Sequence, residues 1–130
     1  MTAIIRQIAI DSRDSYRLSK FWEKVTGWRE DPNDPNEPQH SENLIQSPDG
    51  TMSLLFLNVP ESKQVKNRVH LDLTSDTTRD EEVERLVGIG ATIAADFRTD
   101  DGRGFVVLAD PEGNEFCIVR NDVERADDPS

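Results

Sequence analysis

The chain has 130 residues, of which 35% are hydrophobic and 32% are charged, and its 26 acidic residues outnumber its 15 Lys and Arg to give a net charge of −11. This length suits one soluble domain, and no apolar run approaches the roughly 20 residues of a membrane span. Because an acidic surface repels phosphate backbones and anionic lipids, the charge excludes binding to nucleic acid or to a membrane surface.

The chain begins with a predicted strand and a predicted helix. Apolar residues alternate over residues 4–10, which is typical of a strand and places Gln7 on the face opposite Ile8 and Ile10. A helix with one apolar stripe follows, and Gly27 comes where a left-handed cap would end it. Four residues at helical spacing form the stripe: Leu18, Phe21, Trp22 and Val25.

The rest of the first half predicts short strands separated by turns. Residues 28–30 form a short strand, and the Pro, Asn and Asp residues of 31–38 indicate a loop. Residues 43–46 and 52–58 are predicted strands, because they flank a Pro-Asp-Gly turn at 48–50.

The second half repeats this order of elements. Residues 69–73 alternate in polarity, which places Arg68, His70 and Asp72 on one face of a strand. A capping box of Thr78 and Glu81 starts a helix that carries Val83, Leu86 and Val87. Strands are then predicted at 91–98, 105–109 and 115–120, and the acidic tail at 122–130 is expected to be frayed.

A constant offset relates the two halves. Adding 63 to the positions of Gln7, Gly27 and Pro48 gives His70, Gly90 and Pro111, although the helices are shifted by a further two residues. We therefore predict an α+β fold made of two βαβββ modules in one domain spanning 1–130. Module one covers about 4–58, a linker about 59–66, module two about 67–121, and the tail 122–130.

Three stretches resemble a known family: residues 69–73, 86–92 and 107–116, the last containing Asp-Pro-Glu-Gly-Asn-Glu-Phe. Over residues 4–121 the chain resembles the glyoxalase, bleomycin-resistance and extradiol-dioxygenase superfamily, also called vicinal oxygen chelate proteins. It looks closest to the small glyoxalase-like proteins of bacteria. The resemblance implies two modules whose curved sheets surround a cleft, and a homodimer.

The resemblance also implies four metal-ligand positions, which this chain fills incompletely. The two first-strand positions correspond to Gln7 and His70, both of which can ligate a divalent metal. The two last-strand positions, where metal enzymes of the family mostly have glutamate, correspond to Cys117 and, by the offset of 63, to Leu54. Since Leu54 cannot ligate a metal, we expect no metal or other cofactor; a divalent metal, if one binds, would use Gln7, His70 and Cys117.

Each candidate site residue has a structural alternative. His70 is either a cleft residue whose tautomer Asp72 fixes or an ordinary strand histidine, and Gln7 either faces the cleft or lies on a solvated strand face. Cys117 is either a nucleophile or ligand near His70 or a small buried side chain. Aromatic side chains could line an apolar pocket or belong to the core: Trp28, Phe56, Phe97 and Phe105.

The favoured interpretation is a glyoxalase-like protein that binds, or transforms without the usual metal, a small organic compound. Its ligand would be contacted by Gln7, Leu54, Arg68, His70, Asp72 and Cys117. The first alternative is a divalent-metal-dependent lyase, isomerase or dioxygenase, and the second is a non-catalytic interaction module; whether the chain is an enzyme stays open. A single cysteine and the lack of a basic, apolar leader indicate a cytoplasmic protein.

Overall fold

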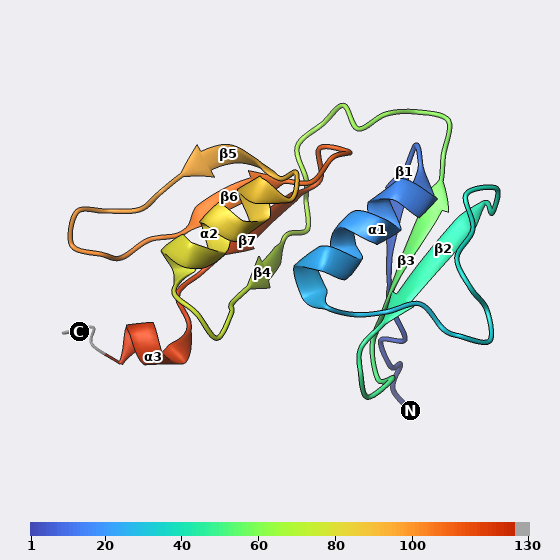
Figure 1. The fold of residues 1–130 in the computed structure, drawn as a ribbon, viewed down its shortest axis with the longest axis horizontal. Helices are drawn as coiled ribbons and strands as arrows, with labels where there is room; N and C mark the ends of the chain where they lie inside the picture. Colours follow the sequence, from blue (N-terminus) through green and yellow to red (C-terminus); the bar gives the residue numbers. More distant parts are fainter. Residues whose placement is uncertain (127–130) are drawn as a thin grey trace. The chain divides into compact units, whose positions relative to one another are not determined.

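The computed structural model describes residues 1–126 and confirms the predicted α+β class (Figure 1). The chain divides into two compact units, the first ending at Gln64 and the second beginning at Val65, so the boundary falls inside the predicted linker at 59–66. Each unit starts with a strand, continues through a helix and ends in antiparallel strands. Within the described residues, no helix has the length and apolar character needed to cross a membrane.

The helix of the first unit confirms the pattern read from the sequence. Helix α1 spans Ser15–Thr26, and the whole predicted apolar stripe is buried. The Asp14 side chain accepts a hydrogen bond from the backbone N–H of Arg17, which caps the start of the helix. Gly27 ends it with a φ of 74°, a left-handed conformation that glycine adopts without the steric cost of a Cβ.

The sheet of the first unit has three strands, β1 (Ile8–Ser12), β2 (Glu42–Gln46) and β3 (Ser53–Asn58), in the order β1-β3-β2. The prediction of a strand from residue 4 is wrong, because Ile4 and Ile5 precede β1 and are 89% and 75% exposed. The strand predicted at 28–30 is reduced to one bridge between Arg29 and Gln46. The first unit is therefore one strand short of the predicted βαβββ module.

The second unit has the complete βαβββ order. Its strands are β4 (Leu71–Leu73), β5 (Thr92–Asp96), β6 (Val106–Ala109) and β7 (Glu115–Ile118), arranged as β4-β7-β6-β5. Strand β4 runs parallel to β7, and the other neighbours are antiparallel. Strand β4 is shorter than predicted, because Val69 and His70 precede it.

Helix α2 spans Arg79–Gly88, and Thr78 caps it by accepting a hydrogen bond from the backbone N–H of Glu81. Val83 and Leu86 are buried as expected, whereas Val87 is 43% exposed. Charged residues on the helix, Arg79 and Glu82, are buried instead.

The expectation of a frayed tail is wrong at its start. Residues Asp122–Arg125 form a short helix, α3, which begins with a capping box between Asn121 and Glu124. The Asn121 side chain also donates hydrogen bonds to the carbonyl groups of Ser75 and Thr77, so it ties the start of α3 to the segment before α2. The remainder of the predicted tail, 127–130, lies outside the described residues.

Candidate functional site

The second unit contains a pocket of about 470 Å³ whose lining is half apolar and half polar. Its apolar wall is formed by Phe97, Phe105, Val107 and Val119. Its polar side chains are Lys66, His70, Asp72 and Cys117. Three of the residues predicted to contact a ligand are thus brought together by one unit.

Strand register explains why these residues share a surface. Asp72 of β4 pairs with Cys117 of β7, which in turn pairs with Val107 of β6, so the three form one row across the sheet. Neighbouring positions in a strand point to opposite faces, and Phe116 and Ile118 are accordingly buried on the other side. The pocket therefore lies on the face opposite the one that carries Phe116 and Ile118.

The chemistry of Cys117 is that of a protonated thiol. Its side chain is 6% exposed, and burial raises the pKa of the thiol; the negative charge of Asp72 and a hydrogen bond with that carboxylate raise the pKa further. Because the thiolate is the form that attacks electrophiles and ligates metals, the surroundings of Cys117 oppose both roles at neutral pH.

Polar contacts hold the segment before β4 at the pocket. The Lys66 Nζ lies 2.5 Å from Glu115 Oε1, and the backbone N–H of Glu115 donates to Asn67 Oδ1 at 3.1 Å. The Nε2 of His70, an exposed side chain, lies 3.3 Å from the carbonyl oxygen of Asn67, a hydrogen bond in the tautomer that is protonated at Nε2. The contact with Asn67 is the hydrogen bond that the structure gives for the His70 ring, whereas Asp72 is hydrogen-bonded to Cys117.

The cation of the pocket differs from the predicted one. Arg68 is exposed and is absent from the pocket lining, whereas Lys66 lies in it. No sequence signal distinguishes Lys66, because it lies in the predicted linker and its partner Glu115 is far away in the chain.

An aromatic pair forms the apolar end of the pocket. The ring centroids of Phe97 and Phe105 are 5.0 Å apart with planes inclined by 35°, and the side chains are 53% and 39% exposed. The backbone N–H of Phe97 donates to the carbonyl of Phe105 at 2.9 Å, which keeps the two residues side by side. Phe56, another aromatic candidate, is fully buried core, and Trp28 does not line this pocket.

The first unit has a pocket of its own, of about 690 Å³, which contains Gln7. Gln7 shares this pocket with polar residues of β2 and β3, including Gln46 and Ser53, and with Arg6. Gln46 and Ser53 are paired across the two strands and so point to the same face. Gln7 is therefore placed at a polar pocket and not among the core residues under α1.

The register corrects the assignment of Leu54. Ile8 pairs with Leu54 in the first unit, whereas its counterpart Leu71 pairs with Phe116 in the second, so Leu54 corresponds to Phe116. Leu54 is 3% exposed and pairs with the buried Ile45, so it belongs to the core. The residue that corresponds to Cys117 is Leu55.

This correction has a simple physical reason. The connection between the paired ends of β2 and β3 comprises residues 47–52, while the connection between β6 and β7 comprises 110–114 and is one residue shorter. A shift of one residue moves every side chain of a strand to the opposite face. The offset of 63 therefore becomes 62 after the turn.

The donor set does not fit the four-ligand metal site of the resembled family. Leu55, at the corrected position, has no donor atom, and the raised pKa of the Cys117 thiol disfavours the thiolate that would ligate a metal. Across residues 1–126, no group of three or more His, Cys, Asp or Glu side chains could hold a metal ion.

Comparisons with known proteins agree with the fold. The sequence profile of a family described as "Glyoxalase-like domain" matches residues 7–119. A glyoxalase/bleomycin resistance protein/dioxygenase family enzyme from Burkholderia phytofirmans PsJN is a structural neighbour with a TM-score of 0.67 and 25% identity, covering 89% of this chain and 97% of that chain. No curated protein matches the sequence.

Two neighbours with lower sequence identity have the same fold. Lactoylglutathione lyase from Agrobacterium tumefaciens has a TM-score of 0.60 and 16% identity, covering 91% of this chain and 93% of that chain. A variant of the fosfomycin resistance protein FosX from Listeria monocytogenes has a TM-score of 0.67 and 14% identity, covering 96% of this chain and 98% of that chain. The FosX structure is a complex with Mn(II) and 1S,2S-dihydroxypropylphosphonic acid.

Proposed function

Because the chain belongs to the glyoxalase-like domain family, we propose that it binds a small organic compound in the pocket of its second unit, without the four-ligand metal site. The observation that carries this proposal is the pairing of an exposed aromatic wall with polar groups in one pocket. Small-molecule sites typically combine an apolar lining with a few polar groups that orient the ligand.

The lining favours a compact, uncharged aromatic compound that carries a hydroxyl or carbonyl group. Phe97 and Phe105 offer ring faces, and a third ring could stack on them or meet them edge-on. Lys66 and His70 offer donors, while Asp72 offers an acceptor. An anionic ligand is disfavoured because the charge of Lys66 is already paired with Glu115 and the chain carries a net charge of −11.

A fluorescent probe of this class tests the proposal. We expect 2-naphthol to bind saturably to the wild-type protein, and Phe105→Ala to weaken its affinity about tenfold, since stacking on one ring and part of the apolar burial are lost. The measurement is a fluorescence titration at neutral pH, with competition by decahydro-2-naphthol, which keeps the hydroxyl group but lacks aromatic rings.

Val123→Ala is the matched control, because Val123 is an 80% exposed apolar side chain of the same unit and does not line the pocket. It should leave the affinity unchanged. Failure of wild-type protein to bind 2-naphthol, or unchanged affinity in both Phe97→Ala and Phe105→Ala, would overturn the proposed site.

The second candidate is a divalent-metal-dependent lyase, isomerase or dioxygenase. The Mn(II) complex of FosX, a structural neighbour, favours this alternative, in which His70 of the second-unit pocket would be a ligand. It predicts a bound metal in the purified protein, whereas a non-catalytic interaction module predicts neither a metal nor binding of the probe.

A further inference from the structure

Arg79, at the start of α2, is one of the most deeply buried charged residues among those described, at 6% exposed. A buried guanidinium destabilises a protein unless its N–H groups are hydrogen-bonded. The contacts that satisfy Arg79 therefore indicate what this residue holds in place.

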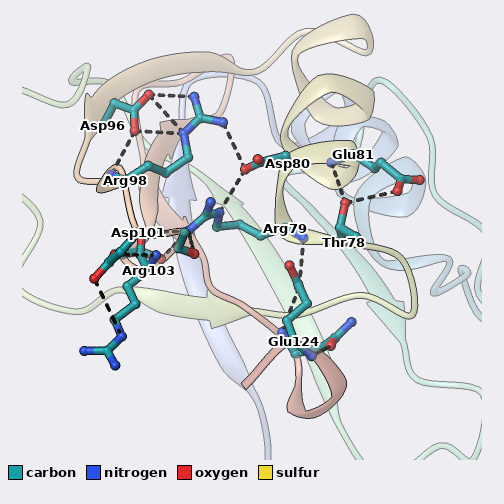
Figure 2. A network of polar contacts seen from close by, with 12 residues as sticks. Thr78, Arg79, Asp80, Glu81, Asp96, Arg98, Asp101, Arg103 and Glu124 are labelled. Carbon is teal, nitrogen blue, oxygen red and sulfur yellow. Dashed lines mark hydrogen bonds and ion pairs between the residues drawn. The ribbon is translucent and has the colours of Figure 1, made fainter. Parts of the chain in front are cut away.

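The Arg79 side chain binds the backbone of the β5–β6 loop, residues 97–105 (Figure 2). Its Nη1 donates to the carbonyl oxygens of Gly102, Arg103 and Gly104 at 3.3, 3.0 and 2.9 Å. One side chain thus gathers three consecutive carbonyl groups, which fixes the returning arm of the loop immediately before Phe105.

The outgoing arm of the loop is held through the next residue of α2. Asp80 Oδ1 accepts from Arg79 Nε at 2.9 Å and from Arg98 Nη1 at 3.1 Å, and Arg98 also pairs with Asp96 (Figure 2). Arg98 directly follows Phe97 in the chain. The first turn of α2 therefore makes hydrogen bonds and an ion pair to both arms of the β5–β6 loop, next to each of its two phenylalanines.

The backbone of Arg79 is itself anchored. Its N–H donates to Glu124 Oε1 at 2.9 Å, and the same carboxylate oxygen accepts from the backbone N–H of Asn121. Helix α3 therefore fixes the end of α2 from which Arg79 and Asp80 reach the loop.

Close packing within the loop restricts it further. Gly104 has a φ of 92°, and a Cβ at this position would lie 2.0 Å from the carbonyl oxygen of Phe97. Residue 104 must therefore be glycine for the two arms to approach as closely as they do. The phenylalanine pair depends on this approach.

We propose that Arg79 is a positioning residue for ligand recognition: through the β5–β6 loop it sets the placement of Phe97 and Phe105, and hence the preference of the pocket for aromatic compounds. The inference rests on the proposed function. Arg79 does not line the pocket, so it acts on the ligand only through the two phenylalanines.

The test compares wild type, Arg79→Met, Arg79→Lys and the matched control Arg85→Met. Arg85 lies on the same helix and pairs with Glu82 of that helix at 2.7 Å. For each protein, the affinities for 2-naphthol and for decahydro-2-naphthol are measured and corrected for the folded fraction determined by circular dichroism.

We expect Arg79→Met to weaken 2-naphthol binding about tenfold and decahydro-2-naphthol binding about twofold. The aromatic preference, which is the ratio of these two affinities, therefore falls about fivefold. Arg79→Lys should give a partial loss, because an ammonium group lacks the planar fork of the guanidinium. Arg85→Met should leave the preference unchanged. A parallel loss of both affinities in Arg79→Met, or an unchanged preference, would show that Arg79 has a structural role only.

Two further measurements apply if Arg79→Met does not fold or if wild-type protein does not bind the probe. If Arg79→Met does not fold, Arg98→Met removes the ion pair that links the outgoing arm of the loop to Asp80, at a partly exposed site. An unchanged preference in that variant and in Arg79→Lys overturns the proposal.

If wild-type protein does not bind 2-naphthol, the proposed function fails. The NMR chemical shifts of the Phe97 and Phe105 ring protons are then compared between ligand-free wild type and Arg79→Met. A change that Arg85→Met does not show supports positioning by Arg79, and no change overturns it.

Discussion

The turn between β2 and β3 is one residue longer than the turn between β6 and β7, and this difference determines which leucine of β3 corresponds to Cys117. Leu54 and Leu55 are neighbours, but Leu54 pairs with the buried Ile45 while Leu55 pairs with Leu44 on the opposite face. The offset of 63 holds for the turn residues and fails in the strand that follows. Side-chain identity alone does not reveal the shift, because both candidates are leucine.

The register can be tested by truncating each leucine in turn. Leu54→Ala is expected to lower the free energy of unfolding by about 3 kcal/mol, because a fully buried leucine leaves a cavity. Leu55→Ala should cost about 1 kcal/mol, because Leu55 is only half-buried. Urea unfolding followed by circular dichroism measures both values. Equal losses, or a larger loss for Leu55→Ala, would contradict the register.

Several site residues can be read from the sequence, and others cannot, for physical reasons. His70 and Asp72 lie two positions apart and both line the pocket, as alternation predicts, because this spacing is a local property of the sequence. Cys117 joins them through the pairing of Asp72 with Cys117, which the sequence does not display. Lys66 and Arg79 were not predicted, because their roles depend on contacts with residues 49 and 23–25 positions away. A charged residue at the start of a helix is usually exposed, so nothing in the sequence marks Arg79 as buried.

At the scale of secondary structure, helices were predicted more accurately than strands. The apolar stripe of α1 and its end at Gly27 agree with the structure because they depend on neighbours within a few residues. Strand ends depend on partners, and β1 starts only where Ile8 meets Leu54 of β3. The apolar pattern at Ile4 and Ile5 has no such partner strand, so these residues stay outside the sheet.

Acid should act on two carboxylates that hold the β5–β6 loop, Asp96 of β5 and Asp80 of α2. A hydrogen bond from Arg98 lowers the pKa of Asp96 from its ordinary value of 3.8 to about 2. The pKa of Asp80 is lowered as well, first by the Arg79 side chain and then by Arg98. A carboxyl group whose pKa is lowered by folding stabilises the folded state when the pH is above the pKa of that group in the unfolded chain. For Asp96 this contribution is lost as the pH falls from about 3.8 through about 2.

We expect Arg98→Met to raise the pKa of Asp96 from about 2 toward 3.8, because its main hydrogen-bond donor is removed. Asp49 is an internal control, since Thr51 and Ser47 hold its pKa at about 2 without any arginine. Side-chain carboxyl shifts measured by NMR from pH 5 downward follow both groups in one sample. An unchanged Asp96 titration in the variant, or a shift of Asp49 of the same size, would contradict the assigned cause.

At the scale of the whole molecule, the question is whether a metal contributes to folding. A resident metal present at about one hundred times its Kd would stabilise the folded chain by about 2.7 kcal/mol, which corresponds to a Tm increase of about 8 °C at this length. Each unit instead has its own buried apolar side chains, such as Trp22 and Phe56 in the first and Leu86 and Phe116 in the second. These cores provide stability that does not depend on a metal.

We therefore expect EDTA to change the Tm of the purified protein by less than about 1 °C, and elemental analysis to find no stoichiometric transition metal. The reason is chemical: Leu55 has no donor atom, and burial with the Asp72 charge keeps Cys117 in the thiol form. The opposite result would be about one metal per chain that is lost in His70→Ala but kept in His40→Ala, the variant of the other histidine. That pattern would place His70 in a metal site, and the metal-dependent alternative would then replace the proposed binding function.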